Sequence, residues 1–129
     1  MMRVLIDTHV LLWAWEDDPR LGRNGRKLLA DPDQPVVVSI VSIWELAIKK
    51  SVGKLGLDLQ LEVLVGSLEE FGFELLPVHP AHALLLAQLP FHHRDPFDRT
   101  LIAQAKHEGL HLLTADPQMR TYDVDIIML

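Results

Sequence analysis

The sequence predicts a single α/β domain with a mostly parallel sheet and helices on both faces. Short apolar runs rich in β-branched residues alternate with stretches of helical periodicity, which is typical of such a sheet. The 129 residues suit one ordinary domain, and 49% hydrophobic with 23% charged residues is a globular balance. No repeat or linker-like run divides the chain. We therefore expect one domain over residues 1–129.

Two strand–helix pairs are expected in the first third of the chain. RVLID (3–7) predicts a strand, and THVLLWAWE (8–16) predicts a short helix after it. LGRNGRKLLAD (21–31) is a candidate helix weakened by two glycines. VVVS (36–39) then predicts the second strand, and SIWELAIKKSVG (42–53) the helix that follows.

The middle of the chain is expected to add an inserted helix, a third strand and a short helix. Apolar periodicity runs from about Asp58 to Phe71, where Gly72 would stop the helix. FELLPV (73–78) predicts the third strand. PAHALLLAQLP (80–90) predicts a short helix between prolines.

The last third begins with a helix predicted from Pro96 to Glu108. Asp95 before that proline is typical of an N-cap, and Gly109 is placed as the C-cap. HLLT (111–114) and VDIIML (124–129) predict two final strands around a turn.

Composition narrows the classes of function. Eighteen acidic and twelve basic residues give a net charge of −6, which argues against a generic electrostatic grip on nucleic acid or an anionic membrane. The absence of cysteine excludes disulfides, thiolate zinc sites and a cysteine nucleophile. It also fits a reducing compartment, and we expect a cytoplasmic protein. Asp7 and His9 interrupt the first apolar run, so neither a signal peptide nor a membrane span is expected.

Four acidic residues are expected at one edge of the sheet. In a parallel sheet, the carboxyl ends of the strands and the first turns of the following helices share an edge, where ligands usually bind. Asp7 ends the first strand and Asp116 follows HLLT, whereas Glu45 and Asp98 are expected in first turns of helices. Capping or a turn would also explain each acid alone, with Ser42 to Glu45 as a capping box.

The neighbours of two of these acids favour a site over capping. Glu45 is flanked by apolar residues on nearly every side, whereas a capping glutamate is normally solvated. Leu101, Ile102 and Ala105 lie three, four and seven residues after Asp98, which places the aspartate on the buried stripe of its helix. Converging carboxylates raise one another's pKa values unless cations neutralise them, and oxygen ligands suit Mg²⁺ or Mn²⁺.

Such a site suits the hydrolysis of phosphodiesters, because a hard cation lowers the pKa of an attacking water and stabilises charge on the phosphate oxygens. Asp7, Asp98 and Asp116 are the expected metal ligands. Glu45 is either a further ligand or the group that orients and deprotonates the water.

Other polar side chains near the acids are weaker candidates. The hydroxyls of Thr8 and Thr114 could hold a water or a phosphate oxygen, or simply cap a helix or turn. Arg94 and Arg99 could contact the substrate backbone.

The remaining cationic and aromatic residues are interpreted as structural. Solvated helix faces account for Lys49, Lys50 and Lys54. His92 and His93 lack a metal-ligand spacing and are expected in a loop or on the surface. Core packing or a subunit interface is expected for Trp13, Trp15 and Trp44.

Four segments together resemble PIN-domain proteins of the VapC toxin type, and the similarity spans almost the whole chain. In chain order they are VLIDTHVLLWAW, VSIVSIWELAIKKSVGKL, RDPFDRTLIAQA and LLTAD. The resemblance implies a PIN-like three-layer fold and a Mg²⁺- or Mn²⁺-dependent ribonuclease. It also implies the toxin of a type II toxin–antitoxin pair, held inactive by a small antitoxin and usually homodimeric.

The acidic residues of that family correspond to Asp7, Glu45, Asp98 and Asp116. The resemblance makes Asp95 an additional acid, and Thr114 matches the hydroxyl residue before the last aspartate.

Two other functions remain open from the sequence. A non-catalytic module could bind a metal for structure and recruit a partner through apolar surface. Phosphoryl transfer on an aspartate, as in haloacid-dehalogenase-like phosphatases or receiver domains, fits less well: His9 stands where the former needs a second acid, and FELLPV lacks the aspartate that the latter needs.

Overall fold

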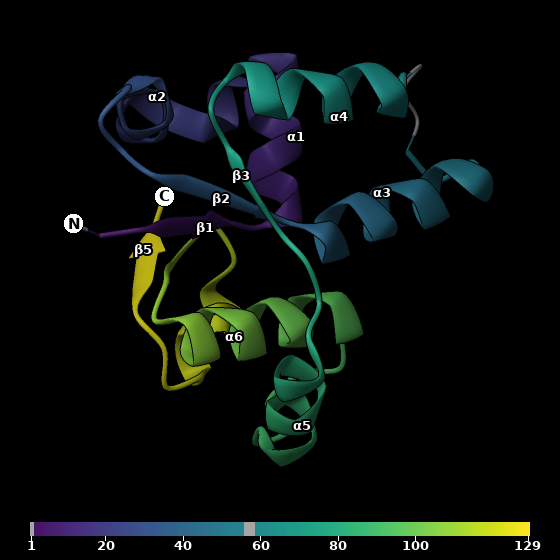
Figure 1. Ribbon diagram of the computed structural model, residues 1–129, viewed down its shortest axis with the longest axis vertical. Coiled ribbons are helices and arrows are strands. Elements are labelled where there is room, and N and C mark those ends of the chain that lie inside the picture. The colour runs from purple at the N-terminus through teal and green to yellow at the C-terminus, as the bar shows by residue number, and fades with distance from the viewer. Residues whose placement is uncertain (1, 56–58) are drawn as a thin grey trace.

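The computed structural model describes residues 2–55 and 59–129. At its centre is a five-stranded sheet in the order β3-β2-β1-β4-β5, and every pair of neighbouring strands is parallel (Figure 1). The strands are β1 (Val4–Ile6), β2 (Val36–Ser39), β3 (Glu74–Leu76), β4 (His111–Thr114) and β5 (Ile126–Met128). The parallel sheet predicted from the sequence is confirmed.

Helices cover both faces of this sheet, which confirms the three-layer expectation (Figure 1). One face carries α1 (Thr8–Glu16), α2 (Gly22–Ala30) and α4 (Leu61–Glu70). The other carries α6 (Pro96–Glu108), against which α5 (Pro80–Gln88) packs. None of the helices in the described ranges is long and apolar enough to cross a bilayer.

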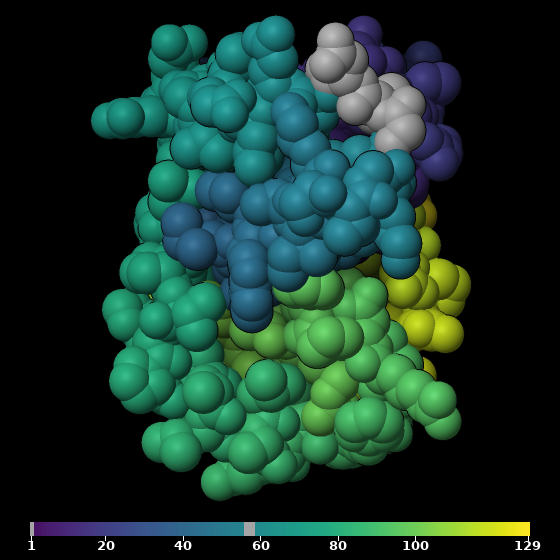
Figure 2. Space-filling view, turned by 90° about the vertical axis from the view of Figure 1, so that its right-hand side faces the viewer, coloured from purple at the N-terminus to yellow at the C-terminus, as the bar shows by residue number. Residues whose placement is uncertain are grey.

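The third helix, α3 (Ile40–Ser51), projects from the carboxyl edge of the sheet. Seen from that edge, it forms a band across the molecule, with α4 above it and α6 below it (Figure 2). Val41 packs in the core on the α6 side, whereas Leu46 packs in the core on the α1 side. Helix α3 therefore links the two layers at the edge where the acids are expected.

The central strand β1 divides the core in two. Val4 and Ile6 belong to the cluster on the α1 side, and Leu5 belongs to the cluster on the α6 side. Successive side chains of a strand point to opposite faces, so a strand covered on both sides must be apolar throughout. That is why RVLID has no alternation of polar and apolar residues.

Helices α1 and α6 have the bounds predicted from the sequence, but α3 begins two residues earlier than expected. The side chain of Ser39, at the end of β2, accepts the Val41 N–H and starts the helix there. Glu45 consequently lies in the second turn of α3, not the first. The alternative interpretation of Ser42 and Glu45 as a capping box is therefore wrong.

The inserted helix α4 begins at Leu61. The start expected near Asp58 lies outside the described residues. Helix α6 ends as predicted at Gly109, which has a φ of +68° and so adopts the left-handed conformation that favours glycine.

Strand order changes direction between β1 and β4. From β1 the chain adds β2 and β3 on one side, and later β4 and β5 on the other. In open α/β sheets, ligands bind in the crevice at such a switch point, outside the carboxyl ends of the strands. Asp7 directly follows β1 and Asp116 lies just beyond β4, so both acids flank this crevice.

Candidate functional site

Asp7 is both the N-cap of α1 and a buried acid. Its Oδ1 accepts the Val10 N–H at 2.8 Å, and the Thr114 hydroxyl donates to its Oδ2. Burial, with a smaller contribution from the charge of Asp116, raises the pKa of the Asp7 carboxyl above its ordinary value. The residue thus serves as cap and as candidate ligand at the same time.

Asp116 is coupled to Asp7 through one threonine. Its Oδ1 accepts the Gln118 N–H at 2.9 Å and caps the 3₁₀ helix η2 (Pro117–Thr121). Its own N–H donates at 3.0 Å to the Thr114 hydroxyl oxygen, whose proton goes to Asp7. Thr114, predicted as a hydroxyl for water or phosphate, therefore holds two acids at the switch point.

Asp98 lies in the first turn of α6, as predicted. Asp95 caps this helix, because its Oδ1 accepts the N–H groups of Phe97 and Asp98 at 2.9 and 3.1 Å. Burial is the main cause that raises the pKa of Asp98 to about 6, followed by the negative charge of Asp95. The charges of Asp7 and Glu45 raise it further, which shows that the three acids share one electrostatic environment.

Glu45 is 2% exposed, and its carboxylate has two unequal oxygens. Oε2 accepts a hydrogen bond from Lys49 Nζ at 2.6 Å. Oε1 is buried without a hydrogen-bond partner among residues 2–55 and 59–129. A buried carboxylate oxygen without a donor is costly, and a bound cation or water would relieve that cost.

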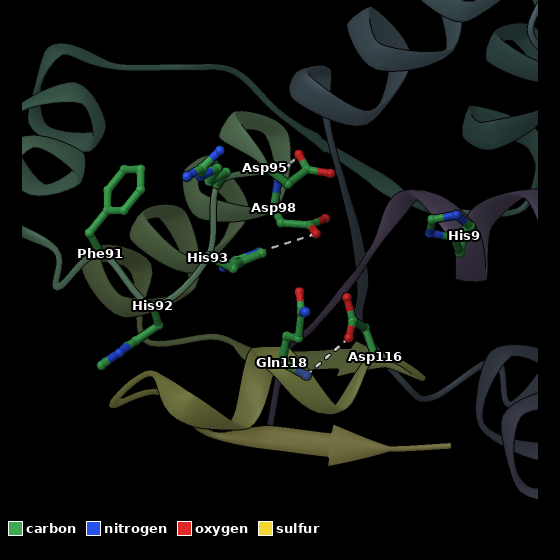
Figure 3. A pocket seen from close by; sticks show the side chains of 9 residues that line it. His9, Phe91, His92, His93, Asp95, Asp98, Asp116 and Gln118 are labelled. Carbon is green, nitrogen blue, oxygen red and sulfur yellow. Dashed lines mark hydrogen bonds and ion pairs between the residues drawn. The ribbon is translucent and has the colours of Figure 1, made fainter.

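Two of the four acids, Asp98 and Asp116, line a cavity of about 610 Å³ at the carboxyl edge together with Asp95 (Figure 3), whereas Glu45 is not among the residues that line it. Asp95, Asp98 and Asp116 lie in its middle, between His9 on one side and Phe91 on the other. A smaller cavity of about 210 Å³ includes Asp7 and shares His9 and Asp116 with the first.

His93 is a site residue that the sequence reasoning missed. It lies in a loop, one of the two places expected from the sequence, but its side chain is largely buried in the cavity wall. The Tyr122 hydroxyl lies 2.8 Å from Nδ1, and Nε2 lies 3.3 Å from Asp98 Oδ2. Tyr122 Oη accepts N–H groups from His93 and Arg99, so its own proton goes to Nδ1 and leaves the Nε2 proton for Asp98. His92, by contrast, is exposed as expected.

Two candidate contacts to substrate have other partners in the structure. The Thr8 hydroxyl donates to Ser42 Oγ at 3.0 Å, where α1 meets α3. Arg99 is buried, and its Nη1 donates to the Pro90 carbonyl at 2.8 Å and to the Tyr122 hydroxyl at 3.2 Å. These two hydrogen bonds of Nη1 hold the loop before α6 in place, and a contact of Arg99 with substrate or water stays a prediction.

Some of the lysines and tryptophans lie where the sequence predicted them, and others do not. Lys49 and Lys50, expected to be solvated, bind Glu45 and the Leu59 carbonyl. Trp13 and Trp15 pack against the core, as expected. Trp44 is 59% exposed on α3.

A hydrated hard cation fits this acidic set. No three of the four acids have carboxylate oxygens within 4.8 Å of one another, since the one such trio among the described residues is His82, His107 and Glu108. Mg²⁺ keeps several waters and binds through one or two carboxylates, so it suits acids that are spaced more widely. The oxygen-only donors and the unpartnered Glu45 Oε1 agree with that choice.

Ordinary hydrogen bonds account for the position of His82 in this trio. His82 Nδ1 accepts the His79 N–H at 3.0 Å, so neutral His82 has its proton on Nε2. Nε2 faces Glu108 Oε2 at 3.2 Å. This nitrogen is therefore a donor to Glu108, and the contact ties α5 to α6.

Comparison with known proteins gives one family and several similar folds. Residues 4–125 match the family model of the PIN domain. VapBC2 from Rickettsia felis, bound to a promoter DNA fragment, has a similar structure with a TM-score of 0.72, 17% identity and 98% of each chain covered. VapBC-5 from Mycobacterium tuberculosis, a member of the VapBC family of toxin–antitoxin systems, has a TM-score of 0.66 and 22% sequence identity, with 100% of each chain covered. VapBC-1 from nontypeable Haemophilus influenzae has a TM-score of 0.68 and 16% sequence identity, with 98% of each chain covered.

None of the curated proteins compared with the chain matches it in sequence. At identities of 16 to 22%, the solved structures establish the fold.

Proposed function

The chain belongs to the PIN-domain family, and from this premise we propose that it is a metal-dependent endoribonuclease that hydrolyses RNA phosphodiester bonds. The observation that supports the proposal is electrostatic: Asp7, Glu45, Asp98 and Asp116 come from four separate segments, yet the charges of Asp7 and Glu45 raise the pKa of Asp98, and the charge of Asp116 raises the pKa of Asp7. Burial and mutual repulsion raise the pKa values of Asp7 and Asp98, and Glu45 Oε1 has no donor within the described parts of the chain. Folding alone gains little from such an arrangement, whereas cation binding removes its cost.

Mg²⁺ or Mn²⁺ is the proposed cofactor, and when bound it would activate a water for attack and stabilise negative charge on the scissile phosphate. Asp7, Asp98 and Asp116 would hold it. Glu45 would orient the attacking water with Oε1, because Lys49 already fixes Oε2. The Thr114 hydroxyl binds both Asp7 and the Asp116 backbone and so fixes their relative positions.

We also propose that the protein is the toxin of a toxin–antitoxin pair. Its structural neighbours include complexes described as toxin–antitoxin systems, which supports a small antitoxin as partner. An apolar groove of about 480 Å³ between α1, α2 and α4 could receive an apolar segment of that partner, with Trp15, Leu29 and Phe73 in its wall.

A homodimer in the cytoplasm is the proposed state of the free protein. Three exposed apolar residues of α3 and its C-cap residue follow one another at every fourth position, so the helical residues form a stripe on one side of α3 that ends at the cap. They are Ile40, Trp44, Ile48 and Val52. A second copy of the chain would bury this stripe.

The test is cleavage of a panel of purified RNAs with Mg²⁺, with Mn²⁺ and with EDTA. Cleavage is expected with a metal, and Asp7→Asn should lower its rate by about 100-fold or more. Asparagine is also a good N-cap, so this variant should fold. Asp33→Asn, an exposed acid in the loop before β2, is the matched control and should cleave normally.

Thermal unfolding gives a second readout that needs no substrate. Millimolar Mg²⁺ or Mn²⁺ should raise the Tm of the parent protein, because the ion binds only the folded state. A Tm shift without cleavage of any RNA would favour the non-catalytic metal-binding module. The absence of a shift with either ion would contradict a preformed metal site.

A further inference from the structure

The loop of residues 90–95, which joins α5 to α6, forms one wall of the acidic cavity. Phe91 stands in this wall at the end away from His9 (Figure 3), and 72% of its surface is exposed. Arg94 lines the same cavity, which is otherwise rich in carboxylates. An exposed aromatic ring and an exposed guanidinium thus stand beside the acids.

The loop is fixed although it has no regular secondary structure. Arg99 is buried beneath it, and its guanidinium carbon lies 4.5 Å from the centroid of the Phe91 ring. The same guanidinium donates to the Pro90 carbonyl at 2.8 Å. The ring therefore has a supported position instead of the freedom expected of an exposed side chain.

A second anchor holds the following residues of the loop. The Tyr122 hydroxyl accepts the His93 N–H at 3.3 Å and the Arg99 Nη1 proton at 3.2 Å. The His92 ring packs edge-on against the Tyr122 ring with centroids 4.9 Å apart. Because Arg99 of α6 and Tyr122, the residue after η2, both bind the loop, Phe91 does not need to be buried to keep its position.

We infer that this loop binds an unpaired base of a single-stranded RNA, which stacks on Phe91 while Arg94 contacts an adjacent phosphate. The inference deepens the proposed ribonuclease function and rests on it for the nature of the ligand. Base stacking is favoured over binding of the phosphate backbone by a basic surface, because the chain has a net charge of −6 and the cavity is acidic. Every base has a face that can stack, but only an unpaired base can present it to a protein ring.

The position of the loop also favours RNA over a protein partner. Phe91 shares the cavity with Asp98 and Asp116, so a base on the ring belongs to the strand whose phosphate the acids would reach. The exposed Phe71 lines the separate apolar groove between α1, α2 and α4.

The test measures binding of an unstructured RNA oligonucleotide that contains 2-aminopurine, a base whose fluorescence falls on stacking. Asp7→Asn protein prevents cleavage during the measurement. In this background, Phe91→Ala and Phe91→Leu should each weaken binding by about 5- to 100-fold and abolish the quenching. Phe91→Trp should retain both. Leu84→Ala, which removes an apolar side chain with 69% exposure from α5, is the control and should bind normally.

The possible outcomes test the RNA-binding loop and the proposed ribonuclease function separately. If the parent protein cleaves RNA and Phe91→Ala binds and cleaves equally well, the stacking platform is refuted and the ribonuclease stands. If binding and quenching depend on Phe91 but no RNA is cleaved with either metal, the ribonuclease fails and the RNA site stands. If Phe91→Leu binds as well as the parent, or if Phe91→Ala alters only self-association in size-exclusion chromatography, the residue is an apolar protein contact and the inference is overturned.

Discussion

Replacing Asp98 by asparagine should stabilise the metal-free protein while it abolishes the proposed cleavage. Burial and neighbouring acids raise the pKa of Asp98 from 3.8 to about 6 in the folded state. This difference corresponds to at most about 3 kcal/mol at neutral pH by which the ionised carboxylate disfavours folding, because solvent screens part of the charge of a partly buried carboxyl. Asparagine removes the charge, but it also loses about 0.5–1 kcal/mol of attraction to the N-terminus of α6. We expect a net gain of up to about 2 kcal/mol.

The gain should depend on pH with a definite sign. Below pH 3.8 the carboxyl is protonated in both states, so Asp98 and asparagine differ little. Between pH 3.8 and about 6 only the unfolded state ionises readily, so the parent loses stability relative to the variant as pH rises. Above pH 6 the difference should be constant.

Urea unfolding followed by tryptophan fluorescence in EDTA, from pH 4 to pH 8, measures both effects. Asp33→Asn is the control and should leave the free energy of unfolding unchanged within about 0.5 kcal/mol. A loss of stability in Asp98→Asn at pH 7.5 would refute the reasoning, as would a gain of the same size at pH 4.

Two further predictions concern the ion pair of α3 and the glycines. Lys49→Met should lower the free energy of unfolding in EDTA by about 1–2 kcal/mol, because it leaves the buried Glu45 carboxylate without its cation; the 36% exposure of the Lys49 side chain keeps the loss below that of a fully buried pair. Urea unfolding beside Lys54→Met, an exposed lysine, checks this, and equal effects of the two variants would contradict it. Gly109→Ala should cost about 1 kcal/mol, since φ is +68° although an added Cβ meets nothing within 4 Å, whereas Gly66→Ala inside α4 should stabilise by up to about 1 kcal/mol. Shifts of the same sign in both glycine variants would show that backbone conformation does not decide the outcome.

The sequence predicted the fold because its signals are local. Strands buried on both faces are continuous apolar runs, and the proline that begins α6 and the glycine after it mark the ends of the helix. The start of α3 was missed because Ser39 is both the last residue of β2 and the cap of the helix. Two elements that meet without a loop leave no sequence signal between them.

The places of three acids in the fold could be predicted from the sequence, whereas the residues that contact them could not. Strand ends and helix starts locate Asp7, Asp98 and Asp116 from chain order alone. Arg99 and His93 depend on Tyr122, which lies 23 and 29 residues further along the chain, and that distance has no periodicity to reveal it. One signal was present for Arg99, which lies three residues before the buried Ile102 and so borders the inward face of α6.

Capping and chemistry are not alternatives at this site, because the same hydrogen bonds do both. The Val10 N–H fixes the start of α1 and also fixes the Asp7 carboxylate at the switch point. The Gln118 N–H does the same for Asp116. Asp95 has two separate effects. One of its carboxylate oxygens caps α6, and its negative charge raises the pKa of Asp98 in the first turn of that helix. Each helix start therefore sets the direction of an acid, and a change that displaced the cap would displace the site before it unfolded the helix.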